Sequence, residues 1–98
     1  MQIDRYVVET LMPDLVGHDR QPSAFLVYLY LWAVIPAGAR SRELSLREIA
    51  EGTGLSKRAV QDALACLIRR ELVSAERDSI TAAARYTLHQ PWRRRSGM

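Results

Sequence analysis

The fold of this chain is decided by residues 45–64, which read SLREIAEGTGLSKRAVQDAL. Ser45 is followed three positions later by Glu48, the pattern of a capping box, in which the hydroxyl and the carboxylate each accept a hydrogen bond from a free backbone N–H group at a helix start. A helix is therefore predicted to begin directly after Ser45. Gly52 and Gly54 end it, because glycine weakens a helix interior and readily adopts the left-handed conformation that closes a helix.

A second helix is predicted on the far side of this turn, where Ser56 supplies another N-terminal cap. The apolar positions of the two helices fit a steep crossing in which both share one core. These positions are Leu46, Ile49, Ala50, Leu55, Val60 and Leu64. The small side chain of Ala50 lets the helices approach closely, and Gly54 accepts the positive φ of the turn. The stretch is therefore predicted to form a helix-turn-helix.

The same register resembles the helix-turn-helix of bacterial or phage DNA-binding regulators. The matching positions are Ala50, Gly54, Leu55, Ser56 and Val60. The continuation, LACLIRRELVSAERDSITAAARYTL, is similar to winged-helix domains, in which the second helix ends in a leucine-basic-basic run and a hairpin follows. The resemblance covers residues 20–90, most of the chain. It implies a mainly α fold with a small β-hairpin wing, that is, a three-helix core plus a two- or three-stranded sheet.

Three parts of the chain are predicted. Residues 1–22 form an N-terminal segment for packing or dimerisation, residues 23–90 form the winged helix-turn-helix domain, and residues 91–98 form a basic C-terminal tail.

The wing is predicted from two stretches that contain β-branched and aromatic residues, 73–77 and 84–88. Asp78 and Ser79 favour a turn between them. A short strand around residues 43–44 is expected to pair with the wing.

The N-terminal segment leaves two alternatives open. Residues 6–8 favour a strand, whereas the apolar spacing within residues 3–11 also suits a helix. Pro13 is expected to break either element, so that a short element ends near Leu11 and an irregular or single-turn connection leads to Pro22.

An almost uninterrupted apolar stretch follows, AFLVYLYLWAVI at residues 24–35. Ser23 caps it, and Pro36 and Gly38 stop it. The stretch is predicted to be a helix too short to span a membrane, since spanning needs about 20 residues. One side of this helix carries Phe25, Tyr28, Leu31, Trp32 and Ile35, and the opposite side carries Leu26, Leu29, Tyr30 and Ala33.

A helix that is apolar all round must be covered all round. One face can form the core of the domain, and a second copy of the chain is the simplest cover for the other. We therefore expect a homodimer whose interface includes the N-terminal segment and Leu26, Leu29, Tyr30 and Ala33. In the alternative, the N-terminal segment and the C-terminal tail cover that face within one chain.

Charge is unevenly distributed along the 98 residues. Residues 1–45 hold four basic against five acidic side chains, whereas residues 46–98 hold ten against six. The basic half contains the helix-turn-helix, which indicates a polyanionic partner. Thirteen of the fourteen basic residues are arginine. A codon-biased genome is the alternative to phosphate recognition as an explanation of this arginine excess.

Other kinds of site find little support. Cys66 is the only cysteine, so a disulfide within the chain and a zinc finger are excluded, and we expect a packed structural thiol. His18 and His89 are expected to be solvated, and no catalytic group, metal site or cofactor site is predicted. No secretory signal is visible, so the protein is expected in the cytoplasm, associated with the nucleoid.

By the resemblance, the second helix, about residues 57–72, enters the major groove of DNA. Arg58 can donate two hydrogen bonds to a guanine there, and Gln61 can both donate and accept at an adenine. Ser56 and Lys57 stand beside the positive end of the helix dipole and suit a phosphate. Further contacts, mainly to the DNA backbone, are expected from Arg47, Arg69, Arg77, Arg85, Arg93, Arg94 and Arg95.

These features predict sequence-specific binding of double-stranded DNA by a small, homodimeric transcriptional regulator. Two alternatives are a DNA-binding module of plasmid or phage replication or partition, and a winged helix used for protein–protein interaction. Arg58 and Asp62 stand four residues apart, so an exposed ion pair is the plain alternative to a base contact. The sequence identifies no target sequence, small-molecule effector or direction of regulation.

Overall fold

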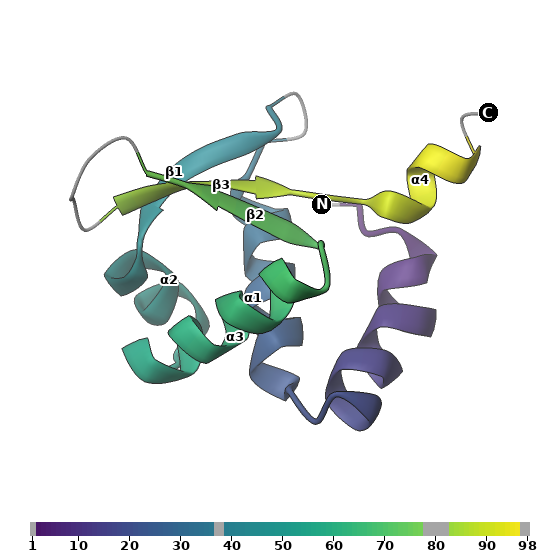
Figure 1. The fold of residues 1–98 in the computed structure, drawn as a ribbon, viewed down its shortest axis with the longest axis horizontal. Coiled ribbons are helices and arrows are strands. Elements are labelled where there is room, and N and C mark those ends of the chain that lie inside the picture. The colour runs from purple at the N-terminus through teal and green to yellow at the C-terminus, as the bar shows by residue number, and fades with distance from the viewer. Residues whose placement is uncertain (1, 37–38, 78–82, 97–98) are drawn as a thin grey trace.

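The computed structural model describes residues 2–36, 39–77 and 83–96, in which a three-stranded sheet lies over a layer of helices (Figure 1). Along the chain the elements are η1 (Val7–Leu11), η2 (Pro13–His18), α1 (Pro22–Val34), β1 (Ser41–Ser45), α2 (Leu46–Thr53), α3 (Lys57–Arg69), β2 (Val73–Glu76), β3 (Ala83–Leu88) and α4 (Pro91–Ser96). The mainly helical content and the order α1, β1, α2, α3, β2, β3 confirm the predicted winged-helix fold class.

The helix-turn-helix forms where its capping residues predict it. The Ser45 hydroxyl accepts from the Glu48 N–H at 3.0 Å, and the Glu48 carboxylate accepts from the Ser45 N–H at 3.0 Å, which completes the capping box. Gly54 closes α2 with a φ of +82°. The Ser56 hydroxyl then caps α3 by accepting from the Ala59 N–H at 3.1 Å. The two helices of the motif therefore begin and turn at the predicted positions.

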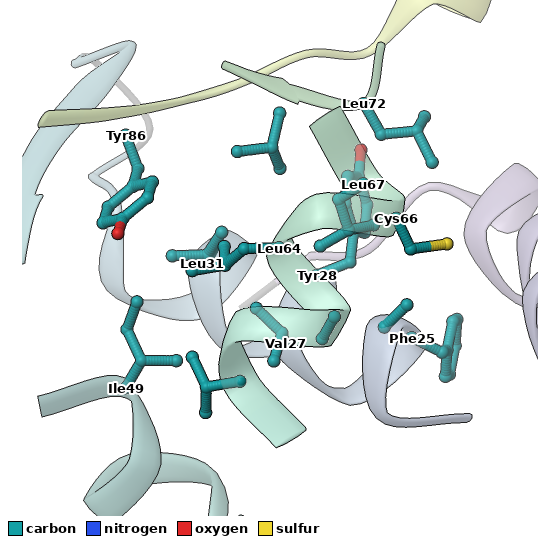
Figure 2. Packing of buried hydrophobic residues seen from close by; sticks show 14 of the residues in the cluster. Phe25, Val27, Tyr28, Leu31, Ile49, Leu64, Cys66, Leu67, Leu72 and Tyr86 are labelled. Carbon is teal, nitrogen blue, oxygen red and sulfur yellow. The ribbon is translucent and has the colours of Figure 1, made fainter. Parts of the chain in front are cut away.

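The core lies between α1, α3 and the inner face of the sheet. Figure 2 shows side chains of these elements pointing into it, among them Tyr28 of α1, Leu67 of α3 and Tyr86 of β3. The Tyr28 hydroxyl donates to the backbone carbonyl of His89 at 2.8 Å, so this buried polar group is satisfied, and burial raises the pKa of Tyr28. Cys66 is buried in the same cluster, as predicted, and burial raises the pKa of its thiol.

The sheet has the strand order β1-β3-β2, with antiparallel neighbours throughout. Leu44 of β1 stands opposite Ala84 of β3, and both face the helices and are buried. The two wing strands and the short strand before α2 are therefore confirmed. The turn predicted at residues 78–79 lies outside the described residues.

The N-terminal segment continues as a helix through Pro13, so the expectation that this proline breaks the element is wrong. Both η1 and η2 are wound as π-helices. Pro13 is the first residue of η2, where a missing N–H costs little, and the N–H of Met12 bonds to the carbonyl of Val7. Val7, Leu11 and Leu15 are buried at four-residue spacing and hold the segment against the core. Of the two alternatives, the helix is correct.

The C-terminal residues fold back as α4 onto the N-terminal segment. The Trp92 ring stacks on Tyr6 at 4.5 Å and on Trp32 at 6.4 Å between ring centroids. The Trp92 indole N–H donates to the Asp4 carboxylate at 2.9 Å, and Arg93 donates to the same carboxylate at 2.6 and 2.7 Å. The basic tail predicted at the end of the chain therefore contains an anchored helix that belongs to the folded domain.

These contacts cover part of α1 within one chain. Tyr30 lies against α2, where the missing side chain of Gly52 leaves room for its ring. Leu29 and Tyr30 are partly buried, whereas Leu26 is 46% exposed and Ala33 is exposed. The homodimer through these four residues stays a prediction. Within the described ranges, no helix combines the length and apolar character needed to cross a membrane.

Candidate nucleic-acid interface

The outward side of α3 carries most of the side chains predicted to read DNA. Val60, Leu64 and Leu67 point into the core and are buried, which turns the intervening positions outward. Lys57, Arg58 and Gln61 are all exposed on the first two turns. Ser56 directly precedes them, and its hydroxyl accepts the capping hydrogen bond of α3. The structure therefore brings the four candidates at the start of α3 together on one surface.

The side chains of Lys57 and Gln61 have no polar partner among the described residues. Lys57 lies in the first turn of α3, where the helix dipole already favours an anion. Both side chains are therefore able to bind a ligand without first giving up an interaction.

Arg58 forms an ion pair with Asp62, which was predicted from the sequence as the alternative to a base contact. Its Nε lies 3.7 Å from a carboxylate oxygen of Asp62, one helical turn further along. The side chains are 85% and 61% exposed, so water screens the pair and a competing anion or base edge can replace it.

Arg47 makes a similar pair on α2. Its Nε lies 3.2 Å from a carboxylate oxygen of Glu51, and both side chains are well exposed. Arg69 is exposed as the last residue of α3. Both arginines remain accessible, but neither lies in the first two turns of α3.

The wing carries its arginines among acidic residues. Arg85 of β3 stands opposite Glu43 of β1 and Glu76 of β2, on the sheet face away from the helices, and it donates to the Ser41 hydroxyl at 3.4 Å. Arg77 is exposed directly after β2. Figure 1 shows this end of β2 toward the same side of the molecule as α2 and the start of α3. The carboxylates beside Arg85 weaken its attraction for phosphate.

The arginines of α4 lie elsewhere. Arg93 pairs with Asp4, and its guanidinium lies 5.7 Å from the centre of the Trp32 ring. Figure 1 shows α4, which also carries Arg94 and Arg95, at the opposite end of the long axis from α2 and the start of α3. Within one chain, α4 therefore lies away from the outward side of α3.

Arg70 turns away from the candidate interface toward the N-terminal segment. Its guanidinium pairs with Asp14 and donates to the Asp19 carboxylate at 3.0 Å. His18 Nδ1 lies 3.0 Å from Asp19, and the hydrogen bond from His18, with the charge of Arg70, holds the pKa of Asp19 below its usual value despite desolvation. This cluster was not predicted from the sequence, although Asp14 and His18 are four residues apart on one helical segment.

The same cluster has the composition of a metal site. Potential ligand atoms of Asp14, His18 and Asp19 lie within 4.8 Å of one another. However, the Arg70 guanidinium contacts both carboxylates and already balances their charge. We therefore assign these residues to an ion cluster that joins the end of α3 to η2.

Arg70→Ala is expected to lower the free energy of unfolding by about 1–3 kcal/mol at neutral pH, because two partly buried carboxylates lose their counter-charge. A lowered native pKa means that the Asp19 contribution is present above the unfolded pKa of about 3.9 and is lost as the pH falls through the native pKa. Urea denaturation at several pH values measures both effects. The destabilisation by Arg70→Ala should shrink below about pH 4, and a pH-independent difference would contradict the assignment.

His89 is not the solvated residue that the sequence suggested. It is partly buried, and its Nε2 lies 3.0 Å from the Ser74 hydroxyl. Its backbone N–H donates to the Leu72 carbonyl at 2.8 Å. His89 therefore ties the end of β3 to β2 and to the end of α3. His18, by contrast, is exposed.

No protein-family model, curated protein or solved structure matches the chain.

Proposed function

We propose that the protein binds double-stranded DNA through α3 and acts as a sequence-specific transcriptional regulator. The observation that carries the proposal is the exposed set Lys57, Arg58 and Gln61 on the first two turns of a helix in a capped helix-turn-helix. The major groove is about 12 Å wide and admits an α-helix, and the N-terminal residues of the second helix of such a motif contact base edges.

Each side chain has a role that its chemistry supports. Arg58 leaves its exposed pair with Asp62 and donates a fork of hydrogen bonds to guanine, while Gln61 donates and accepts at adenine. Lys57 binds a phosphate beside the positive end of the helix dipole. The Ser56 hydroxyl accepts the capping bond from Ala59 and can still donate its own proton to a phosphate.

The proposal includes the homodimer and the cytoplasmic, nucleoid-associated location. A dimer presents two copies of α3 to half-sites about one helical turn apart on the duplex. The exposed side chains of Leu26 and Ala33 support an interface on α1. Light scattering after gel filtration at micromolar concentration tests the dimer independently of DNA.

The DNA-binding proposal is tested by fluorescence anisotropy with a labelled random-sequence duplex. We expect binding at about 50 mM salt that weakens steeply by about 200 mM, because phosphate contacts release counterions. A protein that is folded by circular dichroism yet gives no anisotropy change at the lower salt concentration would contradict DNA binding. That result would leave the protein–protein interaction alternative.

A further inference from the structure

The arginines of the helix-turn-helix are accompanied by carboxylates at one-turn spacing. Arg47 pairs with Glu51 on α2, and Arg58 pairs with Asp62 on α3. All four side chains are more than half exposed. The candidate interface is therefore less positive than its arginines alone suggest, and attraction to phosphates alone is weakened.

Asp62 occupies an unfavourable position for a protein that only holds the DNA backbone. Its side chain is 61% exposed on the outward side of α3, one turn beyond Arg58 and next to Gln61. A carboxylate in the major groove is repelled by phosphates, and an exposed ion pair at this spacing adds little to helix stability. Asp62 therefore opposes backbone binding and contributes little to stability at this place.

We propose that Asp62 determines base specificity on α3. This inference rests on the proposed DNA binding. When Arg58 donates to the O6 and N7 atoms of a guanine, the released Asp62 carboxylate accepts a hydrogen bond from the N4 amino group of a cytosine. A guanine or thymine in the same place presents acceptor atoms to the carboxylate and is rejected. The ion pair of the free protein is thus exchanged for two base contacts at a matching site.

The spacing of the two residues limits where these bases lie. Four residues of an α-helix rise about 6 Å, and successive base pairs are about 3.4 Å apart along one strand. Arg58 and Asp62 are therefore close enough to reach nearby bases of one half-site. The half-site is expected to contain a guanine and a cytosine near each other.

The test is in vitro selection from a random duplex pool with the full-length wild type, Asp62→Ala and Asp62→Asn. The wild type should enrich a cytosine near a guanine. Asp62→Ala should lose the cytosine preference and bind random duplex about 3–10-fold more tightly, because one repulsive charge is gone. Asp62→Asn should exchange cytosine for adenine at that position, because an asparagine amide pairs with the N6 and N7 atoms of adenine.

Glu51→Ala is the matched control, because it removes the carboxylate of the equivalent exposed pair on α2. It should tighten binding to random duplex in the same way and leave the selected sequence unchanged. If Asp62→Ala also leaves the selected sequence unchanged, Asp62 is only an ion-pair partner and the inference is overturned. A wild type that binds no duplex would instead remove the proposed function itself, which is a different outcome from binding with an unchanged sequence preference.

Discussion

Trp92→Ala is expected to lower the free energy of unfolding by about 2–4 kcal/mol, because a large aromatic side chain loses its packing and its hydrogen bond together. In the wild type, the Trp92 ring lies between the N-terminal segment and α1, in stacked contact with Tyr6 and Trp32. Its indole N–H also holds the Asp4 carboxylate, which pairs with Arg93. Equilibrium urea denaturation followed by circular dichroism measures the change.

Arg5→Ala supplies the control on the same N-terminal segment. It removes only the exposed pair between Arg5 and Glu9, whose atoms are 2.9 Å apart, and should change the free energy of unfolding by less than about 0.5 kcal/mol. If Trp92→Ala behaves like Arg5→Ala, the C-terminal helix does not stabilise the domain and the anchored position of α4 is wrong.

The double variant Lys57→Ala/Arg58→Ala is expected to lower the affinity for a selected duplex by about 100-fold. The variant removes a phosphate contact and a bidentate guanine contact, and a bidentate base contact alone is typically worth about 1–3 kcal/mol. The slope of log affinity against log salt should also fall by about 1, because Lys57 no longer neutralises a phosphate. Anisotropy titrations over a series of salt concentrations measure both quantities.

A charge-matched variant separates this effect from a general decrease in positive charge. Arg5→Ala/Arg40→Ala also removes two exposed cations, and neither residue lies on α2 or α3. It should retain the wild-type affinity within about threefold, because screened charges away from the binding surface contribute little. An equal decrease in affinity in both double variants would show that α3 has no special part in binding.

The central part of the fold could be predicted because its signals are local. The capping box of Ser45 and Glu48 and the positive φ of Gly54 depend on neighbouring residues, and the structure has both as predicted. The burial of Val60 and Leu64 likewise follows from helical periodicity, and it places Lys57 and Arg58 outward without further information.

The two ends of the chain could not be predicted in the same way. The Trp92 ring stacks on Tyr6, which lies at the opposite end of the sequence. No local sequence pattern predicts such a contact. The sequence therefore predicted a basic tail but not its packing against Tyr6. The prediction that Pro13 breaks the N-terminal element was wrong because a proline is tolerated where a helical segment restarts. Buried Leu11 and Leu15 on either side of Pro13 hold the segment in place.

The candidate site was predicted in part. Exposure of Lys57, Arg58 and Gln61 follows from the pattern of α3 alone. The acidic surroundings of Arg85 depend on the strand register, which places two glutamates opposite it and which the sequence does not specify. The Arg70 side chain points toward the N-terminal segment because it pairs with Asp14 of η2, and this is a tertiary contact that the sequence does not specify.

The central claim, that α3 binds DNA, is tested most directly by a two-dimensional amide NMR titration of the 15N-labelled protein with a duplex. We predict that the largest chemical-shift changes fall on residues 56–62 and that α4 and the N-terminal segment change little. Changes concentrated on α4 and the N-terminal segment, with residues 56–62 unaffected, would contradict the account.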